Sequence, residues 1–89
     1  LHGAVRCMEA TVFLQRLAAK SSVRDIADAW DRLELPLLES LPDCPPGHKQ
    51  ALATALEDCS KRCSKRDTSK SLMTMRDALL WPPREEYVG

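Results

Sequence analysis

The sequence predicts an all-α fold, a compact bundle of four main helices with an optional short extra helical turn. Apolar residues recur at spacings of three and four along four segments of the 89-residue chain, as they do on helices that bury one face. Nowhere do apolar and polar residues alternate over the length of a strand, and no Asn-Gly or Asp-Gly pair offers a hairpin turn. We therefore expect one helical domain over residues 1–81 and a flexible tail over residues 82–89.

The first helix is predicted to run from Ala4 to Lys20. Its apolar residues are spread around the helix instead of forming a single stripe, which is typical of a helix with neighbours on several sides. The set comprises Val5, Cys7, Met8, Val12, Phe13, Leu14 and Leu17. We therefore expect this helix to be the central one of the bundle.

The second helix is expected to begin at Ser22, whose hydroxyl can cap the free N–H groups of the first turn, and Asp25 favours the positive end of the helix dipole. Pro36 lacks an N–H group and clashes with the preceding turn, so the helix should end or kink near Leu35. Residues 36–41 are then available for the extra turn. The apolar stripe of this helix comprises Val23, Ile26, Ala27, Trp30 and Leu33.

The strongest break in the chain covers residues 42–47, which include three prolines and a glycine. The third helix is predicted after this break, from His48 to Lys65, because its apolar residues follow the spacing of one buried face. That face comprises Leu52, Ala55, Leu56, Cys59 and Cys63.

The fourth helix is predicted to be capped by Asp67, Thr68 or Ser69, whose side-chain oxygens can accept the free N–H groups of its first turn. It should end near Trp81, because two prolines follow. Its core positions are Leu72, Met75 and Leu79, flanked by Met73 and Leu80.

Composition and charge exclude several classes of protein. An apolar fraction of 44% and a charged fraction of 29% fit a folded helical domain. Thirteen basic and thirteen acidic residues cancel, so the chain lacks the positive field that dominates nucleic-acid binding. No apolar run approaches the roughly 18–20 residues that a membrane span needs. The sequence also lacks a nucleophile–base pair, a phosphate-binding glycine loop and a metal-binding carboxylate set, so we expect neither enzymatic activity nor a cofactor.

The four cysteines allow three interpretations. Cys59 and Cys63 lie one turn apart on the buried stripe of the third helix, where free cysteine packs as a small hydrophobic residue, and packing is the favoured interpretation. Bridges from these two to Cys7 and Cys44 would instead indicate a secreted, disulfide-stapled domain. The least favoured interpretation is a zinc site, whose ligands would be Cys44, His48, Cys59 and Cys63.

A single basic cluster stands out in the sequence, at the predicted end of the third helix and in the turn that follows. Cations there complement the negative end of the helix dipole, which explains the cluster without a ligand. No aromatic residue is interleaved to stack on bases, so binding of RNA or phosphate is an alternative and not the leading hypothesis. The cluster comprises Lys61, Arg62, Lys65, Arg66 and Lys70.

Protein–protein interaction is the leading functional hypothesis. Of the two tryptophans, Trp30 is central in its stripe and is expected in the core. For Trp81 two interpretations stay open, which are core packing and contact with a partner. We expect a non-catalytic module of a larger intracellular regulatory or scaffold protein, which docks a partner's helix or peptide between its own helices. The candidate binding residues are Trp81 and the basic cluster. The alternatives are a secreted ligand or receptor domain and an RNA- or phosphate-binding module.

Overall fold

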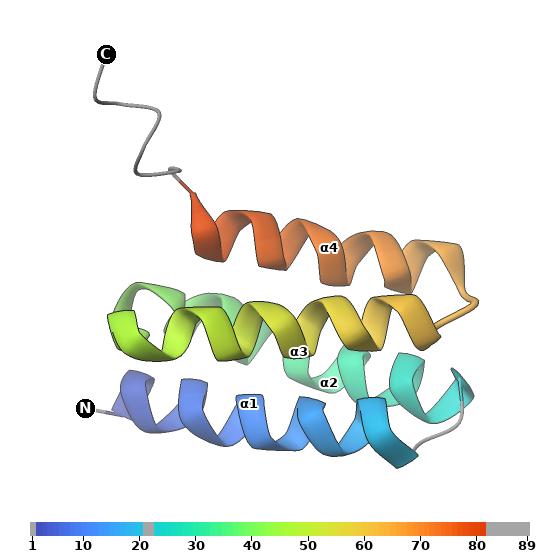
Figure 1. The fold of residues 1–89 in the computed structure, drawn as a ribbon, viewed down its shortest axis with the longest axis horizontal. Coiled ribbons are helices and arrows are strands. Elements are labelled where there is room, and N and C mark those ends of the chain that lie inside the picture. Colours follow the sequence, from blue (N-terminus) through green and yellow to red (C-terminus); the bar gives the residue numbers. More distant parts are fainter. Residues whose placement is uncertain (1, 21–22, 82–89) are drawn as a thin grey trace.

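The chain folds as the expected all-α four-helix bundle (Figure 1). This computed structural model describes residues 2–20 and 23–81. Two short 3-10 turns, η1 and η2, occupy the connection between the second and third helices. The elements are α1 (His2–Lys20), α2 (Val23–Ser40), η1 (Leu41–Asp43), η2 (Pro46–His48), α3 (Lys49–Arg62) and α4 (Arg66–Leu80).

The arrangement of the helices decides which surfaces they leave open. Successive helices run in opposite directions, and α3 lies between α1 and α4 (Figure 1). In the described residues α1 packs against both α2 and α3, α3 packs against α4, and α2 touches α4 only sparsely. The connection from α2 to α3 therefore crosses the end of the bundle, where η1 packs against α1. The α2–α4 side is the least tightly closed side of the bundle.

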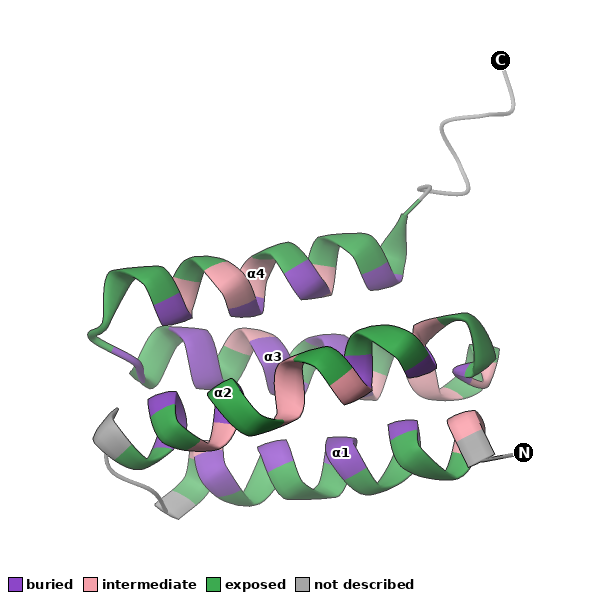
Figure 2. Ribbon diagram, turned by 180° about the vertical axis from the view of Figure 1, so that it is seen from behind, coloured by how far each residue is buried: buried purple, intermediate pink, exposed green. Residues whose placement is uncertain are grey.

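The central helix is α3, so the expectation that the first helix holds this place was wrong. α3 buries residues toward both α1 and α4, whereas α1 buries one face and exposes the other (Figure 2). Val5 is 53% exposed and Met8 and Val12 are each 46% exposed, although all three are apolar. The spread of apolar residues around α1 therefore reflects an uncovered apolar face. The buried residues of α1 are Cys7, Ala10, Thr11, Leu14 and Leu17.

The second helix continues through Pro36, so it does not end near Leu35, which was one of the two outcomes expected there. A proline here cannot donate to the carbonyl four residues earlier, which weakens one turn of the helix. Trp30 and Leu37 lie on either side of that turn and are 1% and 0% exposed, so their packing holds both halves against the core. The Ser40 hydroxyl also donates to the Pro36 carbonyl at 2.8 Å. Residues 36–40 form the last turn of α2, and the extra turn follows as η1.

The core stripes of α3 and α4 are as predicted, but their ends differ. α3 is shorter than expected at both ends, because η2 precedes it and it stops at Arg62. α4 begins at Arg66, before all three predicted caps, and no side chain caps it. Thr68 is buried in the first turn, and Ser69 is held by Ser60 across the α3–α4 turn, with their hydroxyl oxygens 2.6 Å apart. The predicted cap at Ser22 and the tail over residues 82–89 lie outside the described residues.

The buried apolar residues form one cluster shared by all four helices. Its largest members are Trp30, Leu14, Ile26, Leu37, Leu52, Leu56 and Leu72, each under 2% exposed. Burying a leucine or isoleucine side chain contributes about 1.5–3 kcal/mol, so this cluster supplies most of the driving force for folding. The five core positions predicted for α3 and the three predicted for α4 are all buried.

Replacing Pro36 by alanine should raise the free energy of unfolding. Pro36→Ala restores the missing N–H group and removes the steric conflict, and both changes stabilise the helix. The substitution also raises the conformational entropy of the unfolded chain, which is a smaller, destabilising effect. The net increase in the free energy of unfolding should be about 2 kcal/mol. Urea denaturation followed by circular dichroism measures the change. Glu39→Ala, an exposed substitution in the same helix, is the control and should shift the midpoint little. A lower stability for Pro36→Ala would show that the proline ring itself is needed for packing.

Candidate functional site

The sparse contact between α2 and α4 leaves a hollow of about 350 Å³ between them. Four of its α4 residues, Asp67, Ser71, Thr74 and Ala78, recur at spacings of three and four and so share one face of the helix. α2 contributes Glu34 and Leu38, one turn apart. The remaining lining residues are Lys70 and Met75.

A second hollow of about 350 Å³ continues the first toward the end of α4. Leu38 and Ala78 line both hollows, so the two adjoin, and we call them together the α2–α4 groove. From Asp67 in the first turn of α4 to Trp81 just past its end, a stretch of 15 residues borders the groove, which corresponds to about 21 Å of helix. The second hollow adds Leu41, Pro42, Lys49, Leu79 and Trp81.

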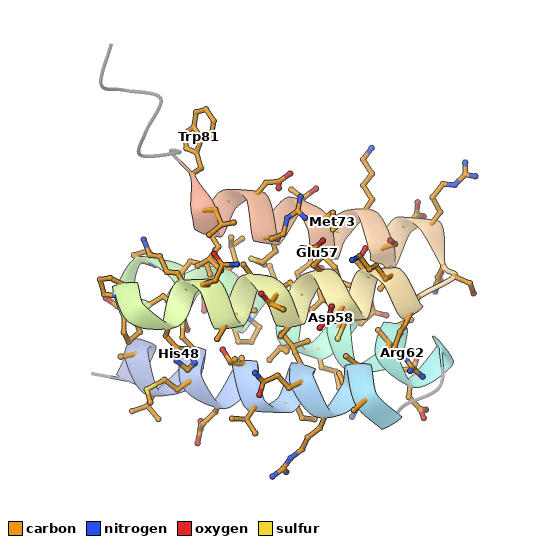
Figure 3. All side chains as sticks on the ribbon, in the orientation of Figure 1. His48, Glu57, Asp58, Arg62, Met73 and Trp81 are labelled. Atoms are coloured by element: carbon orange, nitrogen blue, oxygen red, sulfur yellow. The ribbon has the colours of Figure 1, made fainter. Side chains whose placement is uncertain are left out.

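Trp81 is the most prominent apolar side chain at the groove. It is 67% exposed and projects from the end of α4, away from the bundle (Figure 3). Its backbone N–H donates to the carbonyl of Ala78 at 3.4 Å, which ends the helix. Trp30, by contrast, is buried in the core as expected. The sequence did not decide whether Trp81 is exposed; in the structure its large aromatic surface faces solvent beside the groove.

A polar chain joins the core to the wall of the groove. The indole N–H of Trp30 donates to the Ser71 hydroxyl oxygen at 2.8 Å, and that hydroxyl donates to Glu34 Oε2 at 2.7 Å. Trp30 therefore satisfies its only polar group although it is buried. The chain also links α2 to α4, where apolar contact is sparse. Because the Ser71 oxygen already accepts the indole N–H and its proton is held by Glu34, this arrangement favours a structural role over nucleophilic chemistry.

The groove carries opposite charges at its two ends. Glu34 and Asp67 lie at one end with Lys70, and Lys49 lies at the other end beside Trp81. Among the described residues, none of these four charged groups forms an ion pair. The middle of the groove is apolar, with Leu38 and buried Met75 as its main contributors together with Ala78. The groove can therefore bind by apolar contact along its length and by charge at its ends.

The candidate binding residues proposed from the sequence do not form one surface. Trp81 lies at the opposite end of α4 from the basic cluster, about 22 Å away along the helix. Within the cluster, Lys61 pairs with Glu57 at 3.5 Å, and Arg62 lies on the α1 side of α3, near Cys59 (Figure 3). Lys70 instead faces the α2–α4 groove. The remaining members, Lys65 and Arg66, are exposed at the start of α4.

All four cysteines are buried with free thiols, which agrees with the packing interpretation. The Cys59 thiol donates to the Leu14 carbonyl at 3.2 Å and so joins α3 to α1. The residues of the zinc alternative are not gathered, because His48 lies in η2 just before α3 and Cys59 lies in the last turn of α3, about 16 Å away along the helix axis. In the described part of the chain no three such side chains converge.

The residues that sequence reasoning missed are Glu34, Leu38 and Ser71. Leu38 lies beyond the predicted apolar stripe of the second helix, which stops at Leu33, and it is 48% exposed. Ser71 lies one position before the predicted stripe of α4. The available signal was the indole N–H of Trp30, which needs a partner when it is buried. That signal does not say which helix supplies the partner.

A further hollow of about 430 Å³ lies on the other flank of α2, between α1 and α2. Four apolar residues line it, against seven in the α2–α4 groove, and no tryptophan is among them. The α2–α4 groove is therefore the stronger candidate for binding an apolar partner. The lining residues of the α1–α2 hollow are Phe13, Leu17, Asp25, Asp28, Ala29, Arg32 and Leu33.

Comparisons with protein-family models, with curated protein sequences and with solved structures find no match to this chain. Within the described residues, none of the helices combines the length and the hydropathy needed to cross a membrane. The functional argument therefore rests on the geometry of the groove and of the side chains around it.

Raising the pH should destabilise the fold through two buried thiols. Burial raises the pKa of Cys7 to about 12 and the pKa of Cys59 to about 11, above the value near 9 of an exposed thiol. Because the folded-state pKa values are raised, this contribution to stability is complete below about pH 9 and is lost as the pH rises toward 11–12. Denaturant midpoints at several pH values measure the loss. The decline should be smaller in Cys59→Ala, and an equal decline would contradict the assignment.

Removing the Ser71 hydroxyl should destabilise the fold through Trp30. Ser71→Ala leaves the buried indole N–H without an acceptor, which should lower the free energy of unfolding by about 1–3 kcal/mol. Thr74→Ala is the matched control, because that exposed hydroxyl bonds within its own helix to the Lys70 carbonyl at 2.8 Å. Chemical denaturation compares the two variants. Equal stability of both would mean that the Trp30–Ser71–Glu34 chain contributes nothing.

Proposed function

We propose that this chain is a non-catalytic interaction module of an intracellular regulatory or scaffold protein, which docks an amphipathic helix of a partner protein in the α2–α4 groove. The observation that carries this proposal is an apolar groove about 21 Å long that ends at a tryptophan 67% exposed. Tryptophan is enriched among the residues that contribute most of the binding energy in protein interfaces.

A helix is the occupant that best matches the shape of the groove. The two walls, α2 and α4, run in the same direction along the bundle (Figure 1), and the groove follows α4 from Asp67 to Trp81. A docked helix satisfies its own backbone hydrogen bonds, and this wall offers few free backbone groups to an extended peptide. About 15 residues of helix would cover the distance from Asp67 to Trp81. Partner side chains at positions i, i+4, i+7 and i+11 would then reach Leu38, Met75 and Ala78.

Charge complementarity defines the polar residues of the partner. Glu34 and Asp67 outnumber Lys70 at their end of the groove and form no ion pair among the described residues. A lysine or arginine on the partner helix fits that end, whereas an acidic side chain fits Lys49 at the Trp81 end. Such charges fix the direction of the docked helix, and the apolar centre supplies the affinity.

Four free thiols support an intracellular location, since a reducing compartment keeps cysteines in this form. The distribution of the basic cluster gives less support to RNA or phosphate binding. Its members point toward the groove, toward α1 and toward Glu57 instead of forming one continuous positive surface. The helix-docking proposal therefore uses the charged ends of the groove and not the basic cluster as a whole.

A display library of helical peptides tests the proposal. The peptides would be about 18 residues long, with leucines fixed at i, i+4, i+7 and i+11 and the other positions randomised. We expect selected peptides to bind the chain and to lose about tenfold or more in affinity against Trp81→Ala and Leu38→Glu, measured by fluorescence anisotropy.

Met8→Glu is the matched control, because Met8 is also about half exposed (46%) but lies on the outer face of α1. Binding should be unchanged in this variant. The proposal fails if no library member binds better than its scrambled version. It also fails if Leu38→Glu binds as tightly as the original chain.

A further inference from the structure

Two of the four buried cysteines meet although they are 37 positions apart in the sequence. Cys7 lies on α1, and Cys44 lies between η1 and η2 in the connection that crosses the end of the bundle. α1 packs against η1 there, and Cys44 lies close enough to the Cys7 thiol to contribute to its raised pKa. The two side chains are 0% and 5% exposed, so the contact is sealed from solvent.

The backbone around this pair is packed closely enough to hold the two thiols together. The Cys7 thiol donates to the Ser40 carbonyl at 3.3 Å, and the backbone N–H of Cys44 donates to the Leu41 carbonyl at 3.1 Å. One turn before Cys7, Gly3 lies directly against the side chain of Asp43, where a Cβ atom would overlap it. These contacts fix α1 against the connection on both sides of the pair.

The other two cysteines have no such arrangement. Cys59 lies in the last turn of α3, and Cys63 follows the end of the helix in extended backbone (φ −89°, ψ 121°), so the two residues do not share a helical face. Their thiols donate to the carbonyls of Leu14 and Lys65. The two-bridge option raised by the sequence therefore reduces to one candidate pair.

We propose that Cys7 and Cys44 are a redox pair that forms an intramolecular disulfide when the chain meets a low-molecular-weight disulfide such as oxidised glutathione. This inference is independent of the proposed docking function. It assigns to these two thiols a reversible modification in addition to their packing role.

The chemistry balances as two thiol–disulfide exchanges. The Cys44 thiolate attacks the oxidant, forms a mixed disulfide and releases one glutathione thiolate. The Cys7 sulfur then attacks the Cys44 sulfur and displaces the second glutathione, while the two thiol protons pass to the two glutathione thiolates. The protein loses two electrons and two protons, and one glutathione disulfide becomes two glutathione thiols.

Cys44 is the first to react for a structural reason. It lies in non-helical backbone between two 3-10 turns, where local opening requires less disruption than in the middle of α1. Burial raises the pKa of Cys7 to about 12, so this thiol stays protonated at neutral pH and acts second. The completed bridge would join α1 to the connection and enclose α2 in a covalent loop. It would also fix Leu41 and Pro42, which line the Trp81 end of the groove.

The test is mass spectrometry on the folded, reduced chain after incubation with oxidised glutathione at mildly alkaline pH. We expect the mass to fall by two hydrogens and peptide mapping to join Cys7 to Cys44. Cys59 and Cys63 should be alkylated only after unfolding. The oxidised chain should also unfold at a higher temperature than the reduced chain, and a reductant should reverse the shift.

Two variants separate the pair from the other thiols. Cys63→Ser should form the bridge as the original chain does, whereas Cys44→Ser should not lose two hydrogens. The mapping on the unmodified chain remains decisive if Cys44→Ser is poorly folded. The proposal is overturned by glutathione adducts that persist without a bridge, by a bridge that includes Cys59 or Cys63, or by four thiols that stay reduced while the chain is folded.

Discussion

The packing of α3 between α1 and α4 is the constraint from which the rest of this structure follows. α3 buries two leucines and four small residues, and the small side chains let both neighbouring helices approach it closely. Because α1 and α4 take the two sides of α3, α2 packs mainly on α1 and meets α4 only sparsely. The α2–α4 groove is thus a consequence of how α3 is covered. The small residues are Ala53, Ala55, Cys59 and Ser60.

The spacing of apolar residues predicts the fold where those residues are buried and fails where they are exposed. The spacing of apolar residues identified the buried positions of α3 and α4 and, in α2, Ile26, Ala27 and Trp30. Leu33 of the predicted α2 stripe is only partly buried, and the side chain of Val23 lies outside the described part of the structure. The same pattern misled at α1, since Val5 and Met8 are apolar without being covered. At Pro36 a local rule for ending a helix was outweighed by the burial of Trp30 and Leu37, a tertiary effect that no local pattern contains.

The candidate site was less predictable than the fold, for a geometric reason. Trp81 could be selected as an anchor from its residue type and its place beside two prolines. The groove beside it needs Leu38 and Ala78, which are 40 positions apart and meet only because α2 and α4 run side by side. For the basic cluster the prediction had the opposite problem: its residues are close in sequence, but their side chains point in different directions around the end of α3 and the start of α4. Sequence proximity does not define a surface on helices.

The chain from Trp30 through Ser71 to Glu34 connects the core to the groove. A cation that binds Glu34 competes with the Ser71 hydroxyl for the carboxylate, and Ser71 is the acceptor of the buried indole N–H. If a partner occupies the groove as proposed, it would therefore act on the hydrogen-bond chain that ends at the buried Trp30 indole. The same chain links α2 to α4 where the two helices make few contacts. The proposed binding and the position of α2 would for this reason be coupled through the Ser71 hydroxyl.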